Sequence, residues 1–440
     1  MDNESTQMER NLKMSFIKDT NNLEILMELG EIYYSNSQLE LAKECFLRSL
    51  IICQNLHQKE IIDKKLLLIE QDIQIQQYNT IQPIHNDFLD LLIKELFENA
   101  FNNYYYNIDL ELFQMMSVPF SIDSIVVNTE EEIREISTHL QGISRLYYSL
   151  EDQKSQNLLI KLLSFRLLGN KKVKLPLNTI NYWNKRKSIR DLVISNEKII
   201  TKYHKWNLQL FDLSKIKFDI KLFCIPIGVS ATFIDKQYEY NGDSSVIKVE
   251  EGDVVIDAGG CFGDTALYFA HEIGPKGHVY TIEFIPSNLE IMDKNFSMNP
   301  NLQQQITIVK NPLWDTSNKS IYYKDQGPGS FVTFHETMAL NEKTLTISID
   351  DLVHEKHINK VNFIKMDIEG AELNALKGAI KVIKKFKPTL AIAIYHQVKD
   401  FSNIIQFISS LELGYKFYLG HYTIYALETI LFAVPERKEE

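Results

Sequence analysis

The sequence contains few cysteines: Cys45, Cys53, Cys224 and Cys261 are the four thiols among 440 residues. No two of them form a CxxC pair, and no group of cysteine and histidine residues has the spacing of a zinc site. This pattern does not indicate a disulfide framework or a structural zinc ion. We interpret the cysteines as buried, reduced thiols of a cytoplasmic protein.

The sequence also lacks a long hydrophobic run. Its longest apolar stretch, residues 222–233, contains Pro226 and Gly228 and is too short to cross a bilayer. The first ten residues, MDNESTQMER, are polar and acidic, which does not fit a signal peptide. We therefore expect no membrane insertion and a cytoplasmic location.

Positive charge is in deficit, because the formal net charge is -11. A nucleic-acid-binding surface needs clustered Lys and Arg, so we expect no nucleic-acid partner. One basic cluster, NKRK at residues 184–187, is interpreted as a solvated loop or helix end. The richness in Ile, Lys and Asn is typical of an AT-rich bacterial genome.

Residues 23–75 have a helical pattern. The spacing resembles one tetratricopeptide repeat: large residues and Gly30 lie on a first helix, and Ala42 and Phe46 lie on a second. No clear second copy follows, and one repeat alone cannot form a stable solenoid. Two interpretations stay open: a module that docks a protein partner, or a helical hairpin that packs on the rest of the chain.

The middle of the chain changes character after residue 214. Residues 87–214 are mainly helical in pattern, with many Leu, Ile, Tyr and Phe. Short strands are then expected, and the dipeptide Asn241-Gly242 predicts a hairpin between the last two. The expected strands cover residues 218–227, 232–240 and 245–250.

Strands and helices alternate from residue 253 onward, which predicts a parallel, doubly wound sheet. The last two strands are joined by only a short turn, so we expect an antiparallel pair at the sheet edge. The expected strands are residues 254–258, 278–284, 306–313, 361–368, 389–396, 415–424 and 428–434. The expected helices are residues 264–273, 287–299, 371–386 and 401–411.

The expected fold class is therefore α/β. A five-stranded parallel core completed by an antiparallel hairpin is the Rossmann-like architecture of class I methyltransferases, here preceded by a mainly α-helical region. The expected domains are a tetratricopeptide-like hairpin at residues 1–80, a helical accessory domain at 81–215, a β-rich lead-in at 216–250 and the methyltransferase domain at 251–440.

Residues 252–288 form the stretch with the clearest chemistry: a strand, a glycine turn, a helix, a second strand and an acid. Acids on both sides of the turn would repel a pyrophosphate, which counts against a nicotinamide-dependent oxidoreductase. They suit the cationic amino-acid moiety and sulfonium of S-adenosyl-L-methionine, and Glu283 can accept from ribose hydroxyls. The expected cofactor-binding residues are Asp257, Gly259, Gly260, Gly263, Asp264, Glu283 and Asp315, the last of them facing the adenine.

A second group of polar residues follows buried strands near the C-terminus. The strand in FIKMDIEGAE ends in acids, and a later strand ends in Tyr395-His396. Carboxylates or a histidine there can hold or deprotonate an alcohol. The expected catalytic residues are Asp367, Glu369 and His396, and Glu372 and His421 are expected to line the substrate site.

The motifs VVIDAGGCFGDTALYFA, VYTIEF, TISIDDLV, FIKMDIEGAELNALKGA and LAIAIYH resemble those of the FkbM-type methyltransferases. The resemblance covers about residues 253–434. It implies an enzyme that transfers a methyl group from S-adenosyl-L-methionine to a hydroxyl, often on a sugar, a glycan or a polyketide. It also implies cofactor binding by Asp257, Gly259, Gly263 and Glu283, with Asp367, Glu369 and Glu372 lining the active site.

Our hypothesis is an S-adenosyl-L-methionine-dependent O-methyltransferase acting on a hydroxyl of a sugar, glycan or related natural product. The sequence requires no metal, although Asp367, Glu369 and His396 could together bind a divalent cation. The alternative is a non-catalytic adaptor whose helical region docks a protein and whose cofactor-binding domain is vestigial.

Overall fold

The computed structural model divides the described residues into two compact units. The first comprises the described residues up to 104, together with 130–144 and 160–173, and the second comprises 145–159 and the described residues from 174 onward. This division differs from the four domains expected from the sequence, which remain a prediction. The structure describes residues 2–79, 87–104, 130–202, 205–242, 245–330, 332–335, 340 and 342–436.

The first unit is helical. Gly30 lies on α2 where that helix crosses α3, and an added Cβ there would come 2.8 Å from the Phe46 ring. Leu26, Tyr33 and Phe46 are buried at this crossing. The close crossing matches the pattern of small and large residues in the sequence, but the tetratricopeptide assignment stays a prediction. The helices are α1 (Asp2–Lys18), α2 (Leu23–Ser35), α3 (Leu39–Ile52), α4 (Leu56–Asn79) and α5 (Phe88–Ala100), with parts of α7 (Glu130–Ser149) and α8 (Gln153–Leu168).

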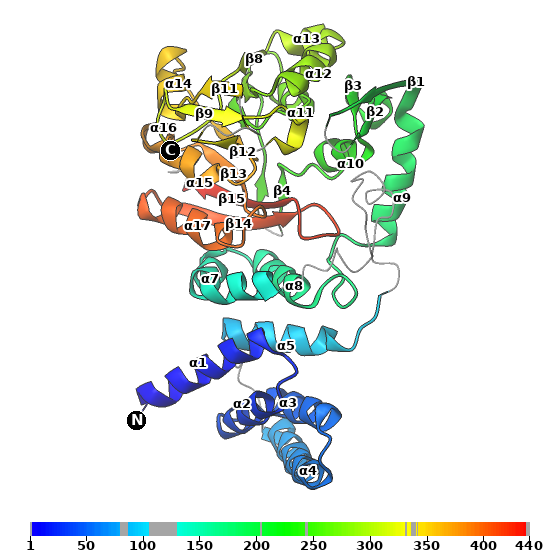
Figure 1. Ribbon diagram of the computed structural model, residues 1–440, viewed down its shortest axis with the longest axis vertical. Helices are drawn as coiled ribbons and strands as arrows, with labels where there is room; N and C mark the ends of the chain where they lie inside the picture. The colour runs from blue at the N-terminus through cyan, green and yellow to red at the C-terminus, as the bar shows by residue number, and fades with distance from the viewer. Residues whose placement is uncertain are drawn as a thin grey trace. The chain divides into compact units, whose positions relative to one another are not determined.

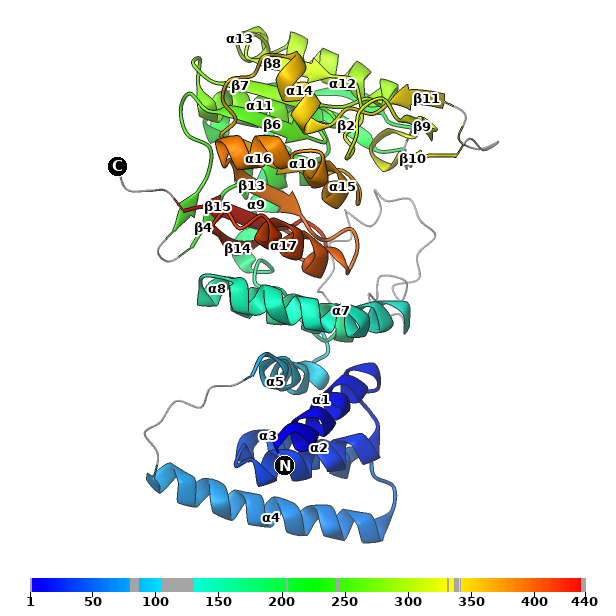
Figure 2. The same ribbon diagram turned by 90° about the vertical axis from the view of Figure 1, so that its left-hand side faces the viewer.

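The second unit is built on a seven-stranded sheet with the order β14-β15-β13-β12-β6-β7-β8, whose strands are labelled between the two views (Figure 1 and Figure 2). The five strands from β13 to β8 pair in parallel, and β15 pairs antiparallel with both β13 and β14. The predicted parallel core with a terminal hairpin is thus confirmed. The strands are β6 (Val254–Ala258), β7 (His278–Ile282), β8 (Ile306–Val309), β12 (Phe363–Met366), β13 (Thr389–Ala393), β14 (Tyr415–His421) and β15 (Thr429–Pro435).

Helices cover both faces of this sheet. Figure 2 shows α16 and α17 in front of it, whereas α11 packs behind against β6 and β7. Val255, Ile256 and Ala258 of β6 are fully buried, as a strand covered on both faces requires. The helices are α9 (Ile180–Ser188), α10 (Pro226–Val229), α11 (Asp264–Ile273), α12 (Pro286–Ser297), α13 (Pro300–Gln303), α14 (Ile349–Glu355), α15 (Glu372–Lys377), α16 (Ile380–Phe386) and α17 (Asp400–Ser410), with short turns η2 (Ile189–Leu192), η3 (Ser214–Ile216), η4 (Ser230–Ile234) and η5 (Gly327–Gly329).

Smaller sheets complete the second unit. They contain β1 (Val193–Ile200), β2 (Asn207–Asp212) and β3 (Lys221–Cys224); β4 (Tyr240–Asn241) and β5 (Val246–Ile247); and β9 (Ser320–Tyr323), β10 (Val332–Thr333) and β11 (Glu342–Leu345). The antiparallel pairing of β4 with β5 confirms the hairpin predicted at Asn241-Gly242. None of the helices described has the length and apolar character needed to cross a membrane.

Three sequence-based assignments were wrong. Residues 193–200 and 207–212 form strands β1 and β2 rather than part of a helical region. The first of these segments begins with Val193-Ile194 and ends with Ile199-Ile200, and such β-branched residues favour strands. Residues 232–234, the start of the strand predicted at 232–240, belong instead to the helical turn η4. The predicted helix at 371–386 is two helices, since Gly378 lies against the backbone of Trp314, where an added Cβ would come within 2.2 Å.

Candidate active site

The glycine turn lies at the carboxyl end of β6, where ligands bind in open α/β sheets. Gly259 has φ +91°, and an added Cβ would lie 2.0 Å from the carbonyl oxygen of Asp367. A Cβ on Gly260 would lie 2.1 Å from Thr281 Oγ1. Glycine is therefore required at both positions for the turn to pack between β7 and the end of β12. Gly263, with φ +82°, is the residue before α11.

Asp257 lies beneath this turn and is fully buried. Lys365 Nζ is 3.1 Å from Asp257 Oδ1 and donates to the Gly259 carbonyl at 2.6 Å. The hydroxyls of Thr265 and Thr281 also donate to the Asp257 carboxylate. Asp257 is not among the residues that line the cleft described below, so the structure gives it a supporting position behind the turn.

Lys365 is a site residue that the sequence did not reveal. Burial lowers its pKa, but the charges of Asp257 and Asp367 and the hydrogen bond to Asp257 outweigh burial and raise the pKa overall. A lysine inside the apolar strand FIKM was the available signal, since a buried lysine needs a paired acid. The identity of that acid depends on register: β12 pairs Lys365 with Asp257 of β6.

A cleft of about 670 Å³ opens above the turn. Its volume is within the range of small-molecule sites. The titratable acids and lysines that line it are five carboxylates and one lysine: Asp264, Glu283, Asp367, Glu369, Glu428 and Lys365. Because Lys365 is held by buried Asp257, the accessible wall of the cleft is strongly acidic. Aromatic side chains also line it, namely Trp206, Tyr238, Phe262, Phe284, Trp314, Phe334 and Tyr395.

Glu283 stands at one end of the cleft, just after β7, and is only 7% exposed. Its Oε1 accepts the backbone N–H groups of Phe284 at 2.7 Å and Ile285 at 2.8 Å, and Oε2 accepts from Asn288 Nδ2 at 3.0 Å. Burial raises the pKa of this carboxyl, against the opposing effect of its hydrogen bonds. These contacts hold the carboxylate in one orientation at the cleft wall.

Asp264, the first residue of α11, lines the same end of the cleft. Its Oδ2 accepts from Thr232 Oγ1 at 3.0 Å, and burial raises its pKa. Asp315 lies elsewhere. The strand expected to end there stops at Val309, and Asp315 pairs with Lys319 at 2.8 Å, whereas neighbouring Trp314 lines the cleft.

The other end of the cleft holds the acids that follow β12. Asp367 accepts two tyrosine hydroxyls: Tyr238 donates to Oδ2 and Tyr395 donates to Oδ1, each at 3.1 Å. Both tyrosines and Glu428 line the cleft, and neither tyrosine was among the site residues expected from the sequence. Tyr395 directly precedes His396, so the strand end that predicted His396 as a site residue could also have predicted Tyr395. Tyr238 lies 129 residues before Asp367 in sequence, and nothing in the sequence connects the two.

His396 lies among three carboxylates. Its Nε2 is 3.3 Å from Asp367 Oδ1 and 3.7 Å from Glu369 Oε2, and its Nδ1 is 3.1 Å from Glu372 Oε1. Burial lowers the pKa of His396, but the interaction with Glu372 and the charges of the three acids outweigh it and raise the pKa to about 9. This part of the molecule therefore favours a cation.

The three acids differ in exposure. The Glu369 side chain is 66% exposed, and the backbone of this residue has φ +57°. The Glu372 side chain is 1% exposed, and its carboxylate accepts a hydrogen bond from Ile368 N–H at 2.8 Å. Glu372 and His396 lie behind the lining residues. His421, at the end of β14, contacts Thr429 Oγ1 through Nδ1 at 2.9 Å and is also outside the lining.

Residues 257–417 match the family model described as the Methyltransferase FkbM domain. This span contains every expected site residue except His421. The chain thus carries a methyltransferase domain, as the sequence motifs predicted.

A curated relative is the hexuronic acid methyltransferase AglP of Haloferax volcanii, which is 24% identical over 182 residues, or 40% of this chain and 72% of the relative. Among solved structures, methyltransferase FkbM from Methylobacillus flagellatus is 19% identical, with a TM-score of 0.44, over 69% of this chain and 61% of that one. Aeropyrum pernix fibrillarin with bound S-adenosyl-L-methionine is 13% identical, with a TM-score of 0.28, over 54% of this chain and 99% of that one.

Proposed function

We propose that this protein is an S-adenosyl-L-methionine-dependent O-methyltransferase that acts on a hydroxyl of a sugar, glycan or related natural product. The observation that carries the proposal is a single cleft with two acidic ends. The glycine turn and Asp264 follow β6, the strand between β7 and β12. Glu283, after β7, therefore lies on one side of the turn, and Asp367 and Glu369, after β12, lie on the other. A cofactor and an acceptor bound in this cleft would meet between those ends.

The cofactor end fits a cationic adenosyl ligand. Glu283 is oriented by two backbone N–H groups and an asparagine amide, and its carboxylate can accept from ribose hydroxyls. Asp264 puts a carboxyl at the start of α11, where a pyrophosphate would otherwise bind. When bound, S-adenosyl-L-methionine supplies a methyl group whose carbon–sulfur bond breaks, leaving the electron pair on sulfur, as the acceptor oxygen bonds to carbon.

The acceptor end contributes positioning and a proton acceptor. Tyr238 and Tyr395 fix the Asp367 carboxylate, which can accept a hydrogen bond from the acceptor hydroxyl. Glu369 is the most exposed acid of this group and can receive the hydroxyl proton during transfer. Holding the oxygen close to the methyl carbon and aligned with it would supply much of the rate.

A carbohydrate acceptor is supported by two observations. Aromatic side chains line the cleft, and Asp367 and Glu369 can accept hydrogen bonds from several hydroxyls. The name of the relative from Haloferax volcanii describes a methyltransferase acting on a hexuronic acid, which is a sugar. We propose a sugar hydroxyl for this chain on these grounds.

Calorimetry with S-adenosylhomocysteine tests the two ends separately. Glu283→Ala removes the oriented carboxylate, so we expect the dissociation constant to rise by about 10- to 100-fold, the effect of losing charged hydrogen bonds. Glu369→Ala should leave cofactor binding unchanged but lower methyl transfer from labelled cofactor to a glycan panel. Glu290→Ala, at an exposed position of α12, is the matched control for Glu283. The reverse pattern would overturn these assignments.

The adaptor alternative makes a different prediction. The tetratricopeptide-like region would dock a protein partner and the second unit would have no catalytic role. Absence of binding heat with both S-adenosyl-L-methionine and S-adenosylhomocysteine would favour the adaptor and contradict the enzyme. Binding without transfer to any tested glycan would contradict the proposed acceptor class and leave the cofactor assignment supported.

A further inference from the structure

We propose that Asp367, Glu369 and His396 bind a divalent metal ion at the acceptor end of the cleft. Each of these residues follows the carboxyl end of β12 or β13, so two adjacent parallel strands bring them together. Asp367, Glu372 and His396 can each place one potential ligand atom within 4.8 Å of the others. The geometry of the imidazole decides which carboxylates complete the site.

The two ring nitrogens of His396 face different carboxylates. Nε2 faces two acids that line the cleft, with Asp367 Oδ1 at 3.3 Å and Glu369 Oε2 at 3.7 Å, whereas Nδ1 faces buried Glu372 Oε1 at 3.1 Å. One ion cannot take both nitrogens of one ring. Two ligands about 2.1 Å from an ion at right angles lie about 3 Å apart, which is close to the spacing on the Nε2 side.

The histidine itself points to a ligand. His396 has a side chain that is only 10% exposed. Its Nδ1 is 3.1 Å from Glu372 Oε1, whereas Nε2 makes no hydrogen bond of acceptable geometry within the described residues. A buried polar group without a hydrogen bond is costly. An ion at Nε2 would give that nitrogen a bond.

The surrounding residues have the arrangement that supports metal ligands. Ligating histidines usually direct the other ring nitrogen at a carboxylate, and ligating carboxylates are themselves hydrogen-bonded. Glu372 is the carboxylate that faces Nδ1 of His396, and the hydroxyls of Tyr238 and Tyr395 donate hydrogen bonds to the Asp367 carboxylate. Two carboxylates with one imidazole suit Mn²⁺, Co²⁺ or Zn²⁺ better than they suit Mg²⁺ or Ca²⁺.

The charge of the cleft adds a reason for a cation at this end. A bound S-adenosyl-L-methionine would place its positive groups near the glycine turn, beside Asp264 and Glu283. The acceptor end would keep the carboxylates of Asp367 and Glu369 against one imidazole, whereas burial raises the pKa of Glu428 to about 8 and leaves it largely protonated at neutral pH. A divalent ion compensates this excess and leaves open positions for oxygens of the acceptor.

The ion would orient two neighbouring oxygens of the acceptor and favour loss of the hydroxyl proton. If Glu369 ligates through Oε2 alone, Oε1 remains available for that proton. This role of the ion rests on the proposed function, whereas binding of the ion does not.

Titration of the full-length chain with Mn²⁺, followed by electron paramagnetic resonance and calorimetry, tests the proposal without cofactor or acceptor. We expect one saturable ion per chain, competition by Co²⁺ and Zn²⁺, and at least tenfold weaker binding in His396→Gln. Glu369→Gln should also weaken binding, and because that side chain is exposed, loss of folding would not explain the result. Glu372→Gln should weaken binding by about 10- to 100-fold through the imidazole.

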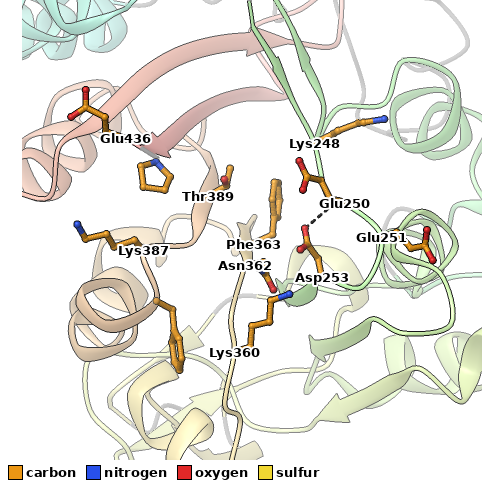
Figure 3. Close-up of a pocket in the computed structure, with 12 residues that line it drawn as sticks. Lys248, Glu250, Glu251, Asp253, Lys360, Asn362, Phe363, Lys387, Thr389 and Glu436 are labelled. Atoms are coloured by element: carbon orange, nitrogen blue, oxygen red, sulfur yellow. Dashed lines mark hydrogen bonds between the residues drawn. The ribbon is translucent and has the colours of Figure 1, made fainter. Parts of the chain in front are cut away.

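A second acidic groove supplies the matched control. It lies at the opposite end of the parallel strands, where Glu250, Glu251, Asp253 and Glu436 mix with three lysines (Figure 3). The double variant Glu251→Gln/Glu436→Gln removes two exposed acids and should bind Mn²⁺ like the unaltered chain. Absence of saturable binding, or binding that persists in His396→Gln and falls in this control, would overturn the metal site.

Binding of S-adenosylhomocysteine, measured on the same samples, separates the two proposals. Binding of S-adenosylhomocysteine in a chain that takes no ion contradicts the metal site and leaves the proposed function supported. An ion held by His396 in a chain that binds no S-adenosylhomocysteine supports the metal site and contradicts the proposed function.

Discussion

Two contacts between a basic side chain and an aspartate lie at the carboxyl end of β12, and they differ in how completely they are enclosed. Lys365 and Asp257 are 1% and 0% exposed, whereas His396 and Asp367 are 10% and 18% exposed. The first pair has hydrogen bonds from two threonines and to a backbone carbonyl. The second borders the cleft. The enclosed pair holds the glycine turn, and we propose that the open pair meets a ligand.

The largest expected effect is at the enclosed pair. Lys365→Met leaves the buried Asp257 carboxylate without its cation, so we expect the free energy of unfolding to fall by about 3–5 kcal/mol. Urea unfolding followed by circular dichroism measures this change. Lys360→Met, near the start of β12 but exposed, should change stability by less than about 0.5 kcal/mol.

The double variant Lys365→Met/Asp257→Asn sharpens this prediction. It removes both charges and should recover part of the stability lost in Lys365→Met, because no unpaired charge remains buried. If the double variant lost more free energy of unfolding than the two single variants lose together, the pairing of Lys365 with Asp257 would be contradicted.

The comparison also shows what could be predicted from the sequence. The parallel sheet followed from apolar runs such as Val254–Ala258 separated by helical patterns, and the terminal hairpin followed from the short connection between the last two strands. These features depend on local periodicity and chain connectivity. The cleft acids Glu283, Asp367 and Glu369 could be predicted for the same reason, because each lies at or just after the carboxyl end of a predicted strand.

Contacts set by register and by distant segments could not be predicted in this way. Lys365 meets Asp257 because β12 pairs with β6 in one register, and a shift of one residue would separate them. Tyr238 reaches Asp367 from a segment that precedes the parallel sheet. Asp257 was expected to contact the cofactor, yet the same register places it behind the turn. Glu372 was expected to line the substrate site, yet the structure buries it beside His396.

The intermediate effect is expected at the open pair. Asp367→Asn keeps the shape of the side chain but removes the charge that faces the acceptor, so we expect methyl transfer to fall by about 10²-fold or more. Stability should change by less than about 1 kcal/mol, because Asp367 is partly solvated. Single-turnover transfer and urea unfolding on the same protein check both parts. A large loss of stability with unchanged transfer would mean that Asp367, like Asp257, supports the fold and does not act on the acceptor.

The smallest expected effects come from removing one hydroxyl donor at each pair. Thr281→Val deletes a buried donor to Asp257 and should lower the free energy of unfolding by about 1.5–3 kcal/mol. Tyr395→Phe deletes a donor to Asp367 at the cleft and should cost about 1 kcal/mol or less, since solvent can replace it, while transfer falls several-fold. Thermal unfolding and initial transfer rates distinguish the two. Equal losses of stability in both variants would mean that the two pairs do not differ in enclosure, and the division between a supporting pair and a ligand-binding pair would fail.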